Sequence, residues 1–243
     1  MKINLITILG LLFLIGCSKS STELFELSKE NLKNNQDDLA VKDLEKLLEK
    51  YPNDSLASQA LYKLSTIYLN WQNDPASGLG ALDKLVKTYP ESKQAKQAKI
   101  EIEEFPDYIL NKTESLRKKE MVKEALDHLM YLTENYSNHQ LIAKAQYMLG
   151  DIYMNDLRDF KTAIQEYRKV IENHKGSTQE PHALFMIGYI YANVLNDMQS
   201  AKIEYEECLN RFPEHELSPS VKFEIEYLGK SVDEIPALKH ITT

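Results

Sequence analysis

One pattern of residues recurs five times along the chain at a nearly constant spacing. Each copy has a small residue, a large residue four positions later, and an aromatic or His residue eleven positions after the first. The copies are Ala40/Leu44/Tyr51, Gly78/Leu82/Tyr89, Ala125/Leu129/Tyr136, Ala163/Tyr167/His174 and Ala201/Tyr205/Phe212. Successive copies are 38, 47, 38 and 38 positions apart. Such a period predicts an array of stacked supersecondary units rather than one globular core.

A second pattern precedes three of these copies. It reads Ala-Gln-Tyr-Met-Leu-Gly-Asp-Ile-Tyr at 145–153 and Ala-Leu-Phe-Met-Ile-Gly-Tyr-Ile-Tyr at 183–191, and residues 60–68 resemble it with Ser65 at the Gly position. Pro follows the aromatic residue of the first pattern at Pro52, Pro90 and Pro213, where it would end a helix. Together the patterns resemble the tetratricopeptide repeat, whose usual period is about 34 residues. The resemblance implies an all-α, superhelical solenoid of about five helix pairs.

The small residues of both patterns have a predicted packing role. Gly150 and Gly188, with Ala163 and Ala201, would let neighbouring helices approach closely. Large residues such as Tyr167 would then fill the space between the helices. We expect stability to come from stacking, because one unit cannot cover its own apolar face.

Two departures from the period suggest the organisation of the chain. The step of 47 places nine extra residues after the second copy, near 106–120, where we predict an insert or hinge. The predicted N-terminal repeat units then span residues 22–105, and the C-terminal units span 121–229. Residues 230–243, which contain Pro236, are predicted to be an irregular tail.

The first 17 residues predict export from the cytoplasm. Lys2 precedes an apolar run of about 13 residues, which is shorter than the ~20 residues of a membrane-spanning helix. A basic residue followed by a short apolar run is typical of a secretory signal peptide, which we predict at residues 1–16. Leu14-Ile15-Gly16-Cys17 resembles the lipobox of bacterial lipoproteins, which implies cleavage after Gly16 and diacylglycerol and fatty acyl (palmitate) groups on Cys17. The alternative is an uncleaved anchor with an incidental cysteine.

The residues after Cys17 suggest where the protein resides. Residues 17–21 form a short lipidated tether, which would keep the folded part within a few tens of ångströms of the bilayer. By resemblance to other lipoproteins, Ser18 favours the periplasmic face of the outer membrane, since an aspartate there typically retains them in the inner membrane. The formal net charge of −8 and the absence of a basic block argue against nucleic acid as a partner.

No motif of the chain indicates catalysis. The sequence has no nucleophile elbow, no Gly-rich phosphate loop and no His-Glu-x-x-His zinc helix. The six His residues are scattered through different repeats, and Cys208 is the only cysteine besides Cys17. We therefore expect no enzymatic activity, no metal, no small-molecule substrate, and no cofactor apart from the lipid on Cys17.

The resemblance to tetratricopeptide repeats implies a partner-binding groove lined by the first helix of each pair. Aromatic side chains there offer rigid contact area, and Asn side chains can pair with an extended peptide. Two other interpretations stay open: that Tyr147 and Phe185 pack between helices, and that the Asn residues cap helices. The predicted groove residues are Tyr62, Thr66, Asn70, Tyr147, Asp151, Asn155, Phe185, Tyr189 and Asn193, with Lys144, Met154 and His182 beside them.

A lipobox, a short tether and about five repeats also resemble, in layout, the BamD family of outer-membrane assembly lipoproteins. This resemblance implies a protein-interaction scaffold that acts as an adaptor in outer-membrane protein assembly, with a β-barrel assembly component or another envelope protein as partner. The alternatives are a cell-envelope coordinator of the Tol–Pal or peptidoglycan type and a docking subunit of polysaccharide export. An enzyme fused to repeats is disfavoured, because no segment is left over to house it.

Overall fold

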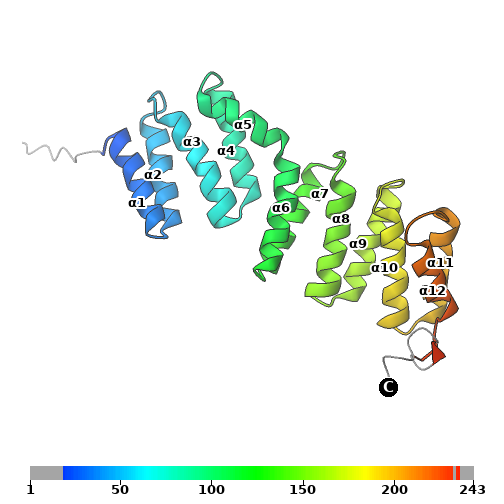
Figure 1. The fold of residues 1–243 in the computed structure, drawn as a ribbon. Coiled ribbons are helices and arrows are strands. Elements are labelled where there is room, and N and C mark those ends of the chain that lie inside the picture. Colours follow the sequence, from blue (N-terminus) through cyan, green and yellow to red (C-terminus); the bar gives the residue numbers. More distant parts are fainter. Residues whose placement is uncertain (1–18, 232–233, 236–243) are drawn as a thin grey trace, which may run out of the picture. The chain divides into compact units, whose positions relative to one another are not determined.

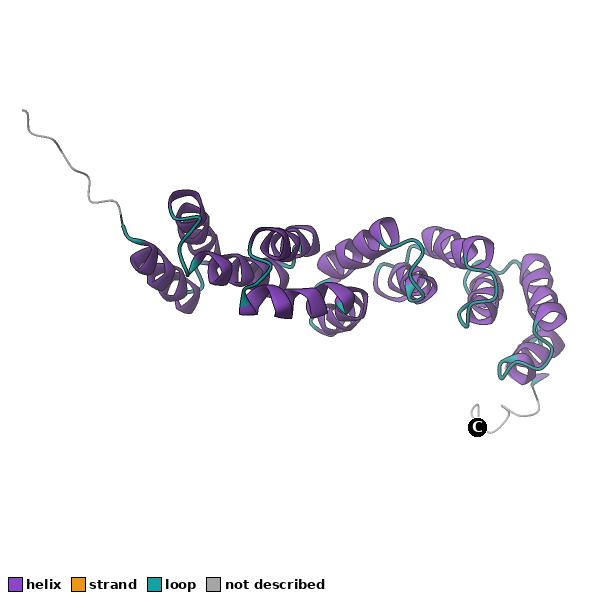
Figure 2. Cartoon of the chain, turned by 90° about the horizontal axis from the view of Figure 1, so that it is seen from above, coloured by secondary structure: helices purple, strands orange, loops and turns teal. Residues whose placement is uncertain are grey.

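The computed structural model describes residues 19–231 and 234–235, and within them the chain is helical without strands (Figures 1 and 2). The predicted signal peptide 1–16, Cys17 and most of the predicted tail 230–243 lie outside these residues. The helices are α1 (Ser21–Lys33), α2 (Asp37–Lys50), α3 (Ala57–Ile67), η1 (Tyr68–Gln72), α4 (Pro75–Thr88), α5 (Lys93–Glu103), α6 (Phe105–Lys118), α7 (Val122–Asn135), α8 (Ile142–Asp151), η2 (Ile152–Asp156), α9 (Phe160–Asn173), α10 (Glu180–Asn193), α11 (Met198–Arg211) and α12 (Ser218–Glu226).

The described residues form two compact units. Unit 1 contains residues up to 72 together with 80–98, and unit 2 contains residues 73–79 together with 99 onward. In unit 1, α1 packs against α2 and α2 against α3. In unit 2, consecutive helices from α6 to α12 pack in the order of the sequence. Each unit is thus an array of helix hairpins, which confirms the all-α repeat fold. The predicted domain boundaries stay predictions.

The turn between the two helices of each hairpin has a shared backbone conformation. Five non-glycine residues have positive φ angles of 51–61°, namely Asn35, Asn73, Glu120, Arg158 and Asn196. They are 38, 47, 38 and 38 positions apart, so the turns follow the same steps as the repeat. Asn tolerates this left-handed region better than most residues, and it occupies three of the five turns.

An Asp cap follows three of these turns. Asp74, Asp159 and Asp197 each accept a hydrogen bond from the backbone N–H three residues later, at 3.0 Å, 3.1 Å and 3.0 Å. Each carboxylate satisfies a backbone N–H that has no partner within the helix. The turn and the cap together explain why the second helix of these pairs begins where it does.

The aromatic residue that ends each copy of the repeat has a role at the opposite end of the hairpin. In unit 1, the hydroxyl of Tyr51 donates to the carbonyl of Lys19 at 2.9 Å, and the hydroxyl of Tyr89 donates to the carbonyl of Pro52 at 2.6 Å. Each of these two Tyr residues therefore ties the end of the second helix of a hairpin to the segment that precedes the first helix of the same hairpin.

The nine extra residues of the long repeat are helical. Residues 93–118 form two helices, α5 and α6, which are interrupted only at Glu104. The apolar face of α6 is buried through Phe105, Ile109, Leu110 and Leu116. The segment predicted as an insert or hinge at 106–120 thus supplies a helix that packs against α7.

Candidate functional site

A groove of about 670 Å³ lies in unit 2. Its walls come from α6, α8, η2 and the start of α10, so residues far apart in the sequence meet there. The lining residues are Glu114, Arg117, Lys118, Lys144, Tyr147, Met148, Asp151, Asp156, Gln179 and His182.

An ion pair joins two walls of this groove. Arg117 Nε donates to Asp156 Oδ2 at 2.8 Å, and about a quarter of each side chain is exposed. Arg117 is near the end of α6, and Asp156 is the last residue of η2. Because the apolar face of α6 is buried, Glu114, Arg117 and Lys118 lie toward the groove and solvent. The groove therefore depends on the helix formed by the extra residues.

Asp151 is half-buried in the groove between two tyrosines. The hydroxyl of Tyr167 donates to Asp151 Oδ1 at 2.6 Å, and the rings of Tyr147 and Tyr167 have centroids 5.2 Å apart. Burial raises the pKa of the Asp151 carboxyl, while the hydrogen bond from Tyr167 and the charge of Arg117 oppose that shift. Burial and the nearby carboxylate also raise the pKa of both tyrosines, so their hydroxyls remain donors at neutral pH. Asp151 thus offers a hydrogen-bond acceptor in a partly desolvated place.

Aromatic side chains continue from the groove to the first turn of α10 and to the loop between α11 and α12. The ring of His182 is 6.3 Å from that of Tyr147 and 5.3 Å from that of His215, in edge-to-face arrangements. His182 Nδ1 also contacts the carbonyl of Thr178 at 3.1 Å. The row Tyr147, His182 and His215 gives rigid, amphipathic contact area next to charged side chains.

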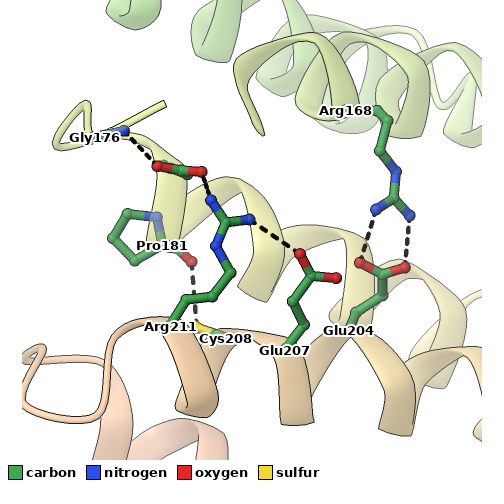
Figure 3. A network of polar contacts seen from close by, with 8 residues as sticks. Arg168, Gly176, Pro181, Glu204, Glu207, Cys208 and Arg211 are labelled. Carbon is green, nitrogen blue, oxygen red and sulfur yellow. Dashed lines mark hydrogen bonds and ion pairs between the residues drawn. The ribbon is translucent and has the colours of Figure 1, made fainter. Parts of the chain in front are cut away.

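A network of ion pairs joins α9, α10 and α11 (Figure 3). Arg168 of α9 makes two hydrogen bonds, of 3.0 Å and 2.5 Å, with Glu204 of α11. Arg211 pairs with Glu180 and with Glu207, the latter at 3.0 Å. Glu180, which is 1% exposed, also accepts a hydrogen bond from the backbone N–H of Gly176 at 2.6 Å. The contacts of Glu180 with Arg211 and Gly176 hold the start of α10, next to the groove residues Gln179 and His182.

Seven of the nine predicted groove residues fall into three sets. Tyr147 and Asp151, with Lys144 and His182, line the groove. Phe185 and Tyr189 lie further along α10, where the ring of Phe185 contacts that of Tyr205 at 5.8 Å and Tyr189 is 36% exposed. The third set, Tyr62, Thr66 and Asn70, lies on α3 and η1 of unit 1, and none of these is among the lining residues.

The three predicted Asn residues lie at the ends of their helices. Asn70 is in η1, Asn155 is in η2, and Asn193 is the last residue of α10, where its side-chain nitrogen donates to the carbonyl of Tyr189 at 3.2 Å. The left-handed turn residues Asn73, Arg158 and Asn196 each come three positions later. All three predicted residues are exposed. Their role as partner contacts therefore stays a prediction.

Sequence reasoning missed the contribution of α6. Glu114, Arg117 and Lys118 line the groove, although they fall in the segment predicted as an insert. Apolar residues at 105, 109, 110 and 116 have the spacing of an amphipathic helix. This spacing is the feature of the sequence that could have predicted the helix.

Three further properties of the described residues bear on function. Across 19–231 and 234–235, no group of three or more His, Cys, Asp or Glu side chains is arranged to hold a metal ion. In the same part of the chain, no helix combines the length and apolarity needed to cross a bilayer. Cys208 is buried, and its thiol is 3.7 Å from the carbonyl oxygen of Pro181.

Comparisons with known proteins identify the repeats. Residues 144–177 and 182–215, which contain α9, α11 and most of α8 and α10, match the model of the tetratricopeptide repeat. These two segments are tetratricopeptide repeats. Residues 18–100 match the model of a family described as "outer membrane lipoprotein". That family is the BamD-like one, so the predicted resemblance is confirmed for this part of the chain. A search of curated proteins finds no match.

Several solved structures are similar at low sequence identity. MamA of Desulfovibrio magneticus is 18% identical, with 82% of this chain and 98% of that chain covered and a TM-score of 0.36. YrrB, described as a TPR protein with an unusual peptide-binding site, is 18% identical, with coverages of 84% and 92% and a TM-score of 0.39. A tetratricopeptide repeat protein of Parabacteroides merdae is 16% identical, with coverages of 87% and 74% and a TM-score of 0.38.

Proposed function

We propose that this chain is a lipid-anchored, non-catalytic scaffold on the periplasmic face of the outer membrane, and that it acts as an adaptor in outer-membrane protein assembly. The observation that supports this most directly is the match of residues 18–100 to the outer membrane lipoprotein model, which begins directly after Cys17. The lipobox-like residues 14–17 supply the attachment site for diacylglycerol and fatty acyl groups. Two or three acyl chains on one cysteine make a stable membrane anchor.

The groove of unit 2 is the proposed partner-binding site. Tyr147 and His182 provide contact area that loses little conformational entropy, and Asp151 and the Arg117–Asp156 pair provide polar contacts. An extended segment of a partner protein suits such a mixed surface better than a small molecule, because the groove is open and its walls are charged as well as aromatic. Lys118 and Lys144, both exposed, lie among the lining residues.

Several features support a binding role rather than catalysis. The burial of Cys208 raises the pKa of its thiol to about 11, so the thiolate that a nucleophile requires is scarce at neutral pH. Of the three carboxylates that line the groove, Asp151 accepts a hydrogen bond from Tyr167 and Asp156 pairs with Arg117. The ion pairs behind the groove join helices to one another, as a scaffold requires.

The test is chemical crosslinking of the lipoprotein in its own envelope, followed by affinity purification and mass spectrometry. Recovery of a β-barrel assembly protein as the dominant partner supports the adaptor proposal. Recovery of peptidoglycan synthases, Tol–Pal components or polysaccharide-export subunits contradicts it and assigns the scaffold to another envelope process. The Cys17→Ala variant is the matched control, because it keeps the folded residues but removes the lipid attachment site.

A further inference from the structure

We infer that the lipid anchor joins the fold through no more than two residues, so that one end of unit 1, formed by residues 51–55 and 89–92, rests against the phospholipid headgroups. This inference rests on the proposed lipidation of Cys17. It adds a membrane-facing surface to the scaffold and thereby fixes which end of unit 1 faces the bilayer.

The residues that follow Cys17 are fixed at the start of α1. Ser20 is the N-cap of this helix, and its hydroxyl accepts from the N–H of Glu23 at 3.2 Å. In return, the N–H of Ser20 donates to Glu23 Oε2 at 2.7 Å. This reciprocal capping box sets the backbone conformation at Ser20 and thus the direction from which the chain enters the helix.

Two further contacts tie the same residues to the α2–α3 loop. The hydroxyl of Tyr51 donates to the carbonyl of Lys19 at 2.9 Å, and the hydroxyl of Ser21 donates to Asp54 Oδ2 at 2.7 Å. Asp54 is itself held by the N–H of Leu56 at 2.8 Å. Residues 19–21 are therefore part of the packed structure of unit 1 rather than a linker.

The covalent chain leaves little distance between this end of unit 1 and the lipid. Cys17 is two positions before Lys19, and two extended residues span at most about 7 Å. The chain length alone therefore limits the acylated sulfur to about 10 Å from the backbone of Lys19, whatever conformation residues 17 and 18 adopt. A tether this short lets the unit tilt but not move away from the bilayer.

The surface next to Lys19 suits the headgroup region. The hydroxyl of Tyr89 donates to the carbonyl of Pro52, which links the α2–α3 loop to the α4–α5 loop. Pro52, Asn53, Pro90 and Glu91 are exposed on these loops. The large exposed apolar residues of the described part of unit 1, Leu39 and Trp71, lie near the other ends of their helices. This polar surface is thus compatible with headgroups but not with insertion among acyl chains.

The two ends of unit 1 are far enough apart to be distinguished. Leu39 is near the start of α2, and the helix runs eleven more residues to Lys50. At about 1.5 Å per residue, Leu39 lies some 15–20 Å from the loop that contains Asn53. A probe at residue 39 therefore reports a clearly different depth from a probe at residue 53 or 91.

The experiment uses the full-length lipoprotein purified from membranes and reconstituted in phosphatidylethanolamine–phosphatidylglycerol vesicles that contain some nickel-chelating headgroup lipid. Nitroxide labels are placed singly by Asn53→Cys, Glu91→Cys or Leu39→Cys, in a Cys208→Ser background. We expect strong paramagnetic broadening of the labels at 53 and 91 and weak broadening at 39. A Gly/Ser spacer of about ten residues, inserted between Ser18 and Lys19, adds roughly 17 Å of root-mean-square reach and should reduce the difference.

Equal broadening at all three positions in vesicle-bound protein would overturn this inference while leaving the lipid anchor intact. Broadening that stays unequal after the spacer is inserted would also overturn it, because the short tether would then not be the cause. Failure of the protein to float with the vesicles, with no acyl mass on Cys17, would instead refute the proposed anchor and the inference with it.

Discussion

The ring of Tyr167 lies directly against the α-carbon of Gly150, so that a Cβ added to this glycine would come 2.5 Å from Tyr167 Cε1. The same relationship holds one repeat later, where a Cβ on Gly188 would come 2.6 Å from the ring of Tyr205. Both tyrosines are fully buried in a close-packed interior, so a methyl group added to either glycine would force a buried ring to shift. The glycines of the repeat thus permit the close approach of α8 to α9 and of α10 to α11.

Gly150→Ala and Gly188→Ala are each expected to lower the free energy of unfolding by about 1–3 kcal/mol, as overpacking of a close-packed core does. Thermal melting followed by circular dichroism measures the effect. Gly80→Ala is the control, since a Cβ there meets nothing within 4 Å in the interior of α4. It should be neutral or stabilising by up to ~1 kcal/mol. Equal destabilisation by all three substitutions would refute the packing account.

A compensating change should restore much of the loss at Gly150. In the second repeat, Ser65 and Leu82 occupy the two positions that Gly150 and Tyr167 occupy in the fourth. The double variant Gly150→Ser/Tyr167→Leu should therefore be more stable than Gly150→Ser alone, because the smaller side chain makes room for the added atoms. Additive destabilisation by the two changes would contradict a direct contact between these positions.

The Arg168–Glu204 pair provides a test of the buried ionic network. Glu204 has 8% of its side chain exposed, so Arg168→Met would leave a nearly buried carboxylate without its cation. We expect a loss of about 2–3 kcal/mol in the free energy of unfolding, at the low end for a broken buried pair because Arg168 is partly exposed. Lys202→Met, which removes the exposed pair with Glu206, should cost at most about 0.5 kcal/mol. Similar losses in the free energy of unfolding for both variants would show that burial does not determine how much the Arg168–Glu204 pair stabilises the fold.

His128 should make the stability of unit 2 depend on pH. Its ring is fully buried, Nδ1 contacts the carbonyl of Glu124 at 2.8 Å, and Nε2 has no hydrogen-bond partner among the described residues. Burial lowers the pKa of this imidazole, helped by Lys112 and opposed by the Glu124 carbonyl, Asp127 and Asp74. The folded state therefore binds the proton less readily than the unfolded state, whose pKa is near 6.5.

The sign of this effect follows from proton linkage. Stability from neutral His128 is fully present above about pH 6.5 and decreases as the pH falls toward the lowered pKa of the folded state. Melting temperatures measured between pH 8 and pH 5 should fall more steeply for the wild type than for His128→Leu, which removes the titrating group. Parallel pH profiles for the two proteins would exclude His128 as the source.

Substitution of Asp151 distinguishes an effect on the stability of the fold from an effect on partner binding. Its carboxyl has a raised pKa because burial disfavours the charge, so the ionised form is costly to the fold at neutral pH. Asp151→Asn keeps an acceptor for the Tyr167 hydroxyl and should melt at a higher temperature than the wild type at pH 7, with the difference shrinking in acid. If this more stable variant no longer crosslinks to the partner, the negative charge of Asp151 is required for binding.

The repeat positions and their packing could be predicted from the sequence because each depends on residues within one period. Gly150 and Gly188 stand out as small residues in an otherwise apolar helix, and their tyrosine partners recur at the same spacing. The Asp caps at Asp74 and Asp197 follow from the Asn-Asp dipeptides. These features are local, so a single sequence is enough to find them.

The site was less predictable, because it depends on contacts that span different repeats. The pair of Arg117 with Asp156 joins residues 39 positions apart, and nothing in the period indicates it. The 47-residue step suggested an insert or hinge at 106–120, whereas the buried side chains of α6 show a helix that forms one wall of the groove. Polar residues on the exposed face of that helix concealed its amphipathic pattern.

The most direct test of the account is site-specific photo-crosslinking in intact cells, with a photoreactive amino acid at residue 144 on the groove or at residue 165 on the exposed surface of α9. Both positions are exposed, and only Lys144 is among the groove-lining residues. If the groove of unit 2 binds the partner, the probe at 144 captures one dominant envelope protein from the outer-membrane assembly machinery and the probe at 165 does not. Capture of the same partner with equal yield at both positions, or no capture at 144, would contradict the assignment of this groove as the binding site.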